Sequence, residues 1–136
     1  MKKFKIITVE NDEDEQFFMK EGFDKTGKFE IIAQLANGDE LSDWFEQSNN
    51  VLPDIILSDL NMPGKNGYDI LDEITNSETL SHIPVIITST SYTKSIIDKC
   101  LARGAAEYVV KPDTFIEYGP FIENLYRIIV EKRLVK

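Results

Sequence analysis

The sequence predicts an α/β fold, a doubly wound parallel sheet of five strands with helices on both faces. Short runs rich in β-branched and aromatic residues alternate five times with longer segments whose apolar residues recur at helical spacing. Such alternation leads to parallel strands joined by right-handed crossovers. The 136 residues contain no internal repeat, low-complexity tract or linker. This length is typical of one domain, so we expect a single domain over residues 1–136.

Five short segments have the composition of strands, because β-branched and aromatic residues favour a pleated, half-buried surface. They are Phe4–Val9, Phe29–Leu35, Ile55–Ser58, Val85–Ser89 and Glu107–Val110. The third and fourth segments are apolar over most of their length, which is typical of central strands that are covered on both faces. We therefore expect these two strands in the interior of the sheet.

Between the strands the apolar residues change to helical spacing. The residues that show it are Met19 and Phe23; Leu41, Trp44 and Phe45; Ile70, Leu71 and Ile74; Ile96, Ile97, Cys100 and Leu101; and Phe121, Leu125, Ile128 and Ile129. Gly27 and Gly104 suit helix C-caps, Gly38 leads into the second helix, and Pro120 suits the first turn of the last. Gly22 lies inside the first helix, where it is less favourable than Ala.

Composition and charge exclude several classes of partner. The chain has 24 acidic and 15 basic residues and a formal net charge of −9, so it would repel nucleic acids and anionic membranes. Its apolar runs are far shorter than the roughly 20 residues of a membrane span, and its amino terminus does not have the pattern of a signal peptide. The single cysteine, Cys100, cannot form an internal disulfide. We expect a cytoplasmic protein.

Polar side chains stand at the ends of four predicted strands, where ligands bind in open parallel sheets. They are Glu10, Asn11 and Asp12 at the first strand, Asp59 and Asn61 at the third, Ser89 and Thr90 at the fourth, and Lys111 at the fifth. Oxygen ligands of this kind suit a hard cation such as Mg²⁺, which binds through one or two carboxylates, waters and phosphate oxygens. The sequence therefore predicts a magnesium site at this edge.

This set of residues can support transfer of a phosphoryl group to a carboxylate, with Asp59 as the nucleophile. A metal would bridge Asp59 and the incoming group, while Lys111 supplies a positive charge and Ser89 a hydrogen bond. Without a metal, we expect repulsion among Glu10, Asp12 and Asp59 to raise the pKa of at least one carboxylate.

Four stretches of the chain carry the motifs of one known family. They are Ile6–Asp12 (IITVEND), Pro53–Gly67 (PDIILSDLNMPGKNG), Pro84–Thr90 (PVIITST) and Gly104–Pro112 (GAAEYVVKP). In these stretches and in their order, the chain resembles the receiver domains of two-component response regulators. The resemblance covers essentially the whole chain, and it implies a flavodoxin-like sheet with the strand order 2-1-3-4-5.

The resemblance also implies roles for individual residues. Asp59 would be the phosphoacceptor, with Mg²⁺ as cofactor and a sensor histidine kinase or histidine phosphotransfer protein as the phosphoryl donor. Ser89 corresponds to the switch hydroxyl, Tyr108 to the switch aromatic residue and Lys111 to the amine of the family. The implied metal ligands are Glu10, Asn11, Asp59 and the backbone carbonyl of Asn61, with Asp12 as an additional candidate.

The chain departs from the family pattern in three places. The family usually has two consecutive acids after the first strand, whereas this chain has Glu10 and then the neutral Asn11, so we expect weakened metal binding. Thr90 stands where a smaller residue is common, and we expect it to narrow access to Asp59 and slow transfer. In the stretch 115–120, Gly119 and Pro120 are expected to delay the start of the last helix.

Several of these residues also have a purely structural interpretation. Asp12 suits the N-cap of the first helix as well as it suits a metal. The acidic run Asp12–Glu15 is predicted to be a solvated first turn stabilised by the helix dipole, and Ser91 is predicted to cap the fourth helix. His82, the single histidine, is predicted to lie in a loop without a chemical role. Tyr108 fits the role of an ordinary aromatic residue of the core or surface as well as it fits the role of a switch.

We expect the protein to be a signalling switch, not a metabolic enzyme. Phosphorylation of Asp59 would shift the population of conformations, and the face made by the fourth helix, fifth strand and last helix would change its affinity for a downstream protein target. The predicted last helix runs almost to Lys136, so the output is expected to pass through a protein partner. A homodimer is left open.

Two other functions belong to different classes. In the first, the chain is a degenerate receiver that binds partners without phosphorylation, because Asn11 spoils the metal site. In the second, it is a magnesium-dependent phosphatase with an aspartyl nucleophile. The phosphatase is disfavoured, because such enzymes need a second acid two residues after the nucleophile and this chain has Asn61 there.

Overall fold

The computed structural model describes residues 3–47, 51–112 and 118–135. Its strands are β1 (Phe4–Val9), β2 (Phe29–Leu35), β3 (Ile55–Asp59), β4 (Val85–Ser89) and β5 (Glu107–Val110). All neighbouring strands are parallel, and they form one sheet in the order β2-β1-β3-β4-β5. The predicted fold class and strand order are confirmed. β3 extends one residue beyond the prediction, so that Asp59 is itself the last residue of the strand.

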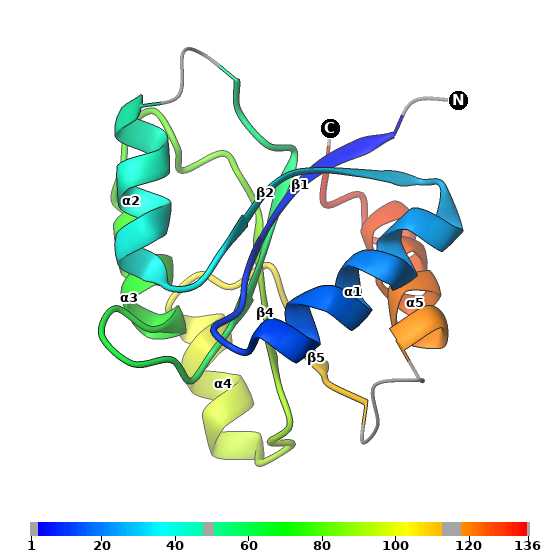
Figure 1. Ribbon diagram of the computed structural model, residues 1–136. Coiled ribbons are helices and arrows are strands. Elements are labelled where there is room, and N and C mark those ends of the chain that lie inside the picture. Colours follow the sequence, from blue (N-terminus) through cyan, green and yellow to red (C-terminus); the bar gives the residue numbers. More distant parts are fainter. Residues whose placement is uncertain (1–2, 48–50, 113–117, 136) are drawn as a thin grey trace.

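Helices cover both faces of this sheet, as predicted (Figure 1). They are α1 (Glu13–Thr26), α2 (Gly38–Gln47), α3 (Gly67–Thr75), α4 (Lys94–Ala102) and α5 (Tyr118–Glu131). Helices α1 and α5 lie together on one face, and α2, α3 and α4 lie on the other (Figure 1). None of the helices in the described part of the chain is long and apolar enough to cross a membrane.

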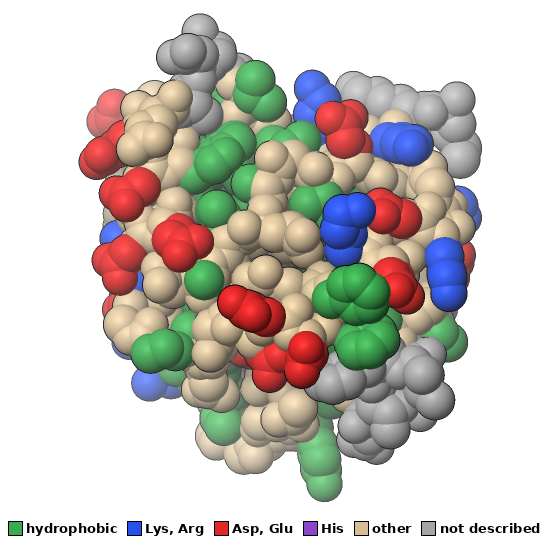
Figure 2. All heavy atoms as spheres, in the orientation of Figure 1, with side chains coloured by type: hydrophobic (Ala, Val, Ile, Leu, Met, Phe, Trp, Pro, Cys, Tyr) green, Lys and Arg blue, Asp and Glu red, His purple; other side chains and the backbone are tan. Residues whose placement is uncertain are grey.

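Acidic side chains are prominent on the surface. Figure 2 shows them over α2 and around the start of α1, which agrees with the formal net charge of −9. Because α1 begins at the carboxyl edge of the sheet, part of this negative charge lies beside the predicted site. A phosphoryl group approaching this edge from the side of α1 therefore meets repulsion unless a cation compensates it.

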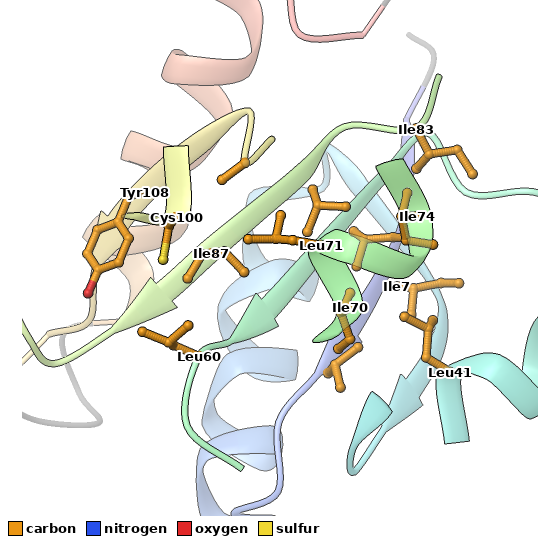
Figure 3. Packing of buried hydrophobic residues seen from close by; sticks show 14 of the residues in the cluster. Ile7, Leu41, Leu60, Ile70, Leu71, Ile74, Ile83, Ile87, Cys100 and Tyr108 are labelled. Carbon is orange, nitrogen blue, oxygen red and sulfur yellow. The ribbon is translucent and has the colours of Figure 1, made fainter. Parts of the chain in front are cut away.

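Each face of the sheet has its own apolar core, because side chains alternate between the two faces of a strand. Under α1 and α5, the core contains Ile6, Ile55, Leu57, Ile86 and Val109 from the strands. Under α2, α3 and α4, it contains Ile7, Ile56, Ile87 and Tyr108 (Figure 3). By the same alternation, Asp59 lies on the α1/α5 face and Ser89 on the α2–α4 face. The alternation thus separates two of the predicted site residues.

Three glycines in or next to helices have a structural reason for the absence of a side chain. Gly22 lies inside α1, and a Cβ there would stand 3.0 Å from Ile122 Cγ1 of α5, so its absence lets the two helices approach closely. Gly104 follows the C-cap Arg103 with a φ of +106°, a conformation that favours glycine. Gly27 is the left-handed C-cap of α1, as predicted, whereas the predicted C-cap Gly104 follows the C-cap of α4 by one residue.

The starts of the last two helices differ in part from the prediction. Ser91 does not cap α4, because the helix begins only at Lys94 and its N-cap is Thr93. Helix α5 begins at Tyr118, so Gly119 and Pro120 lie within its first turn. The predicted delay of α5 depends on the stretch 115–120, and residues 115–117 of it lie outside the described residues.

Candidate functional site

Asp59 and Lys111 meet at the carboxyl edge of the sheet. Asp59 is buried at the end of β3, and its Oδ1 accepts a hydrogen bond of 2.9 Å from the Leu60 backbone N–H. The same Oδ1 is 3.3 Å from the Lys111 ammonium. Lys111 directly follows β5, and its backbone N–H donates to the Ser89 carbonyl at 2.8 Å. The structure therefore brings together the two residues that the sequence predicted to act on one phosphoryl group.

The Lys111 ammonium lies among three carboxylates. Its Nζ is 2.6 Å from Glu10 Oε1, 2.9 Å from Glu15 Oε2 and 3.3 Å from Asp59 Oδ1. The side chains of Lys111 and Glu10 are only 5% and 2% exposed. An ammonium has three N–H donors and no acceptor, so three carboxylates match its donor capacity. Glu10, Asp59 and Lys111 therefore form one buried group of charges that interact with each other.

Glu15 is the member of this network that the sequence did not predict. It was assigned to a solvated first turn of α1, and its neighbours Glu13 and Asp14 are indeed exposed. Glu15 instead turns toward the sheet and binds Lys111. The signal that could have found it is its position three residues after the N-cap Asp12, which directs a side chain back toward the start of the helix.

Burial controls the electrostatics of the site. It raises the pKa of Glu10 to about 7, with the hydrogen bond to Glu15 adding to the rise and Lys111 opposing it. Burial also raises the pKa of Asp59, again against the effect of Lys111. The predicted rise in carboxylate pKa is confirmed, but its main cause is loss of hydration and not repulsion between like charges. For Lys111, burial lowers the pKa, and the carboxylates outweigh it to give a net rise.

The other predicted metal ligands lie at the surface beside this buried network. Asn11, Asp12 and Asn61 are exposed. Asp12 caps α1, where its Oδ1 accepts from the backbone N–H groups of Asp14 and Glu15 at 2.9 and 3.1 Å. Within residues 3–47, 51–112 and 118–135, no group of three or more His, Cys, Asp or Glu residues has an arrangement that could hold a metal ion. The capping interpretation of Asp12 is confirmed.

Ser89 and Tyr108 are joined through Ser91 on the opposite face of the sheet. The Ser89 hydroxyl is buried and accepts a hydrogen bond of 3.2 Å from the Ser91 N–H. The Tyr108 hydroxyl donates to the Ser91 carbonyl at 2.7 Å, and its ring belongs to the core under α4 (Figure 3). Ser91 therefore connects the two predicted switch residues, although the sequence assigned it only to helix capping. Thr90, next to them, is exposed.

Two buried threonines add polar atoms close to the site. Thr8 Oγ1 and Thr88 Oγ1 have no hydrogen-bond partner in the part of the chain that the structure describes. Thr88 pairs with Asp59 across β3 and β4, so one of these hydroxyls lies beside the predicted phosphoacceptor. A buried hydroxyl without a partner costs about 1–3 kcal/mol.

A family model described as the response regulator receiver domain matches residues 6–117. Among curated sequences, the chain is 41% identical over 63 residues to the two-component response regulator ORR12 of Oryza sativa subsp. japonica, covering 46% of this chain and 52% of the relative. It is 29% identical over 112 residues to the two-component response regulator-like protein APRR7 of Arabidopsis thaliana, covering 82% of this chain and 15% of that protein. The chain thus spans about half the length of relatives such as ORR12.

Solved structures show the same fold. The phosphorylated cyanobacterial phytochrome response regulator RcpA is 26% identical, with a TM-score of 0.83 and coverage of 96% of both chains. The Mn²⁺-bound form of response regulator Rcp1 is 23% identical, with a TM-score of 0.77 and coverage of 90% of this chain and 91% of that one. At this identity the second likeness concerns the fold alone.

Proposed function

Because the chain belongs to the response regulator receiver domain family, we propose that it is a phosphoacceptor switch of a two-component phosphorelay, phosphorylated on Asp59. The observation that carries this proposal is the Asp59 carboxylate at the end of β3 with the Lys111 ammonium 3.3 Å from its Oδ1. The phosphoryl donor is a phosphohistidine of a sensor histidine kinase or a histidine phosphotransfer protein. The single buried cysteine suits a reducing cytoplasm.

In the transfer, an oxygen of Asp59 attacks phosphorus. The P–N bond to the donor histidine breaks, its electron pair returns to the imidazole nitrogen, and a P–O bond forms to give an acyl phosphate on Asp59. Asp59 Oδ1 already accepts from Leu60 and faces Lys111. In the described part of the chain, Oδ2 has no such donor, so it is the oxygen left for attack. Lys111 compensates charge on the phosphoryl oxygens.

Some of the residues at this edge are suitable ligands for Mg²⁺, and others are not. The carboxylates of Glu10 and Asp59 and the backbone carbonyl of Asn61 would hold it, since Mg²⁺ uses one or two carboxylates together with waters and phosphate oxygens. Asn11 contributes at most a neutral oxygen, and Asp12 is committed to capping α1. Bound there, the ion would supply positive charge to the transferring phosphoryl group. We expect a weak affinity for Mg²⁺, because Glu10 is also the closest partner of Lys111.

The signal leaves the site through the opposite face. A phosphoryl group on Asp59 accepts a hydrogen bond from the Ser89 hydroxyl, and as the hydroxyl turns toward it, the bond that Ser89 accepts from the Ser91 N–H is strained. Because Tyr108 is bound to the Ser91 carbonyl, the change reaches β5 and the start of α4. The population of conformations then shifts at the surface of α4, β5 and α5, where a downstream protein target binds. The protein assists its own phosphorylation and dephosphorylation and does not turn over a separate substrate.

A degenerate receiver that binds its partner without phosphorylation is the second candidate. Two observations favour it: the neutral Asn11 at the metal site and the Lys111 ammonium already bound by three carboxylates. Partner binding that is unchanged by Mg²⁺, by acetyl phosphate and by Asp59→Ala would select this second function.

Intact-mass spectrometry tests the proposed function directly. With Mg²⁺ and acetyl phosphate, the wild-type protein gains the mass of a single phosphoryl group, and Asp59→Ala gains none, because the nucleophile is missing. Asp98→Ala is the matched control, since Asp98 is an exposed aspartate of α4 that pairs only with Lys94 among the described residues. This control retains the labelling. An unlabelled wild-type protein, or labelling that persists in Asp59→Ala, contradicts the proposal.

A further inference from the structure

We propose that Glu15 is a positioning residue that occupies one donor of Lys111 and gives it up to the phosphoryl group during transfer. The inference rests on the proposed role of Asp59 and deepens it. Its basis is the contact of 2.9 Å between Glu15 Oε2 and Lys111 Nζ, which joins the first turn of α1 to the end of β5. Glu15 acts through Lys111 and does not itself touch the reacting atoms.

The local structure at the start of α1 explains why Glu15 is available. Asp12 and Glu15 stand at the positions of a capping box, in which the glutamate would accept from the backbone N–H of the N-cap residue. Here the Asp12 N–H donates instead to Glu10 Oε2 at 3.1 Å. The carboxylate of Glu15 is thereby released from capping and reaches the ammonium of Lys111.

Glu15 is the partner that Lys111 can lose most easily. The ammonium donates hydrogen bonds to Glu10 and Glu15 and forms a longer ion pair of 3.3 Å with Asp59, so a phosphoryl oxygen that binds it competes with these carboxylates. Glu10 is 2% exposed, and breaking its pair would leave a buried charge without compensation. Glu15 is 18% exposed and lies on the outermost turn of a helix. It can therefore turn into water while the phosphoryl oxygen takes its place.

The charge of Glu15 also opposes the arrival of the phosphoryl group. Glu10, Glu15 and Asp59 surround one cation, so the network is negative before any phosphate enters. The neutral Asn11 removes one carboxylate from the edge of the sheet, and Glu15 supplies another from α1. This substitute is partly exposed and binds Lys111. Neutralising it should free one donor of Lys111 and reduce repulsion together.

The first test compares Glu15→Gln with Glu13→Gln, which removes the same charge from an exposed neighbour in the same turn. The measurement is the initial rate of Asp59 labelling by acetyl phosphate with Mg²⁺, followed by intact mass. Loss of one charge-assisted contact should raise the rate of Glu15→Gln roughly tenfold, and added salt should reduce this gain. Glu13→Gln stays within about twofold of wild type. Glu15→Asp retains the charge and returns the rate toward wild type.

The second test needs no phosphorylation. The ¹H–¹⁵N signal of the Lys111 ammonium reports how well its protons are protected from exchange with water. Exchange should be faster in Glu15→Gln than in wild type and unchanged in Glu13→Gln. Identical exchange in both variants overturns the inference whether or not Asp59 is labelled. An unchanged labelling rate in Glu15→Gln overturns it as well, while labelling that still depends on Asp59 leaves the proposed function intact.

Discussion

On the α1/α5 face, the carboxyl edge of the sheet ends in charged side chains, whereas on the α2–α4 face it ends in hydroxyl groups. Glu10, Asp59 and Lys111 are all buried, and the Lys111 Nζ lies 2.6 Å from Glu10 Oε1 and 3.3 Å from Asp59 Oδ1. Their interactions are therefore strong, and each depends on the charge of the others. A new anion at this face would change the charge balance of every member, which is consistent with the proposed role of Asp59 as phosphoacceptor.

The hydroxyl groups of the other face are linked differently. Ser89 and Tyr108 both bind the backbone of Ser91, and neither carries a charge. A neutral hydrogen bond contributes only about 0.5–1.5 kcal/mol, so this face can rearrange at small cost. In the proposed switch, the alternation of side chains along β3, β4 and β5 would therefore separate binding of the anion from the response to it.

The largest expected effect comes from Lys111→Met, which removes the cation from the charged face. At pH 8 it leaves the buried Glu10 and Asp59 without compensation and should lower the free energy of unfolding by about 3 kcal/mol, measured by urea denaturation. Both carboxyls already have raised pKa values, and loss of the cation raises them further. Glu10, whose pKa is already about 7 with Lys111 present, is then protonated in the folded state at pH 5.5, so the loss becomes smaller as the pH falls.

Lys132→Met is the matched control for this prediction. Lys132 also lies 2.6 Å from a carboxylate, that of Glu107, but its side chain is 57% exposed. Water screens such a pair, so the control should lose less than about 1 kcal/mol at either pH. If both variants lose the same amount, or if the loss for Lys111→Met grows at low pH, the three carboxylates are not a buried network around Lys111.

The strands and the meeting of Asp59 with Lys111 follow from local pattern and from the geometry of parallel sheets. β-branched runs define the strands, and parallel strands bring their carboxyl ends to one edge. For Glu15, the spacing from the N-cap Asp12 indicates only that its side chain turns toward the start of α1, and its contact with Lys111 could not be predicted in this way. It depends on Glu10 taking the N–H of Asp12, a contact between a strand end and a helix start that no residue spacing reveals. The main cause of the raised pKa values, burial, likewise appears only once the sheet is covered by α1 and α5.

Ser91 shows the same limit on the other face. Its residue type favours an N-cap, but α4 begins later, at Lys94. What Ser91 binds is decided by where Tyr108 lies after β5 has paired with β4. Predictions that rest on strand pattern and on the geometry of the parallel sheet were therefore right, and contacts that depend on how a helix start or a loop packs against the sheet were missed.

A smaller effect is expected for Tyr108→Phe, which sharpens the contrast with the charged face. The variant loses the hydrogen bond to the Ser91 carbonyl and should lower the free energy of unfolding by about 1 kcal/mol. The initial labelling rate should stay within about twofold of wild type, because the contacts of Lys111 are unchanged and the lost hydrogen bond joins two neutral groups. Tyr92→Phe, next to Ser91 in the loop before α4 and exposed, is the control and should change neither quantity. A tenfold fall in labelling for Tyr108→Phe would mean that the two faces are not separate.

The smallest effect is a gain in stability from Thr8→Val. Thr8 lies on the charged face, and its buried hydroxyl has no partner in the described part of the chain. Valine has nearly the same shape without the polar atom, so the free energy of unfolding should rise by roughly 0.5–1 kcal/mol in urea denaturation. Thr75→Val is the control, because the Thr75 hydroxyl donates to the Leu71 carbonyl at 2.7 Å and its removal should not stabilise. A loss of stability in Thr8→Val would show that this hydroxyl is satisfied in solution, and that polar groups of this face extend below the carboxylates.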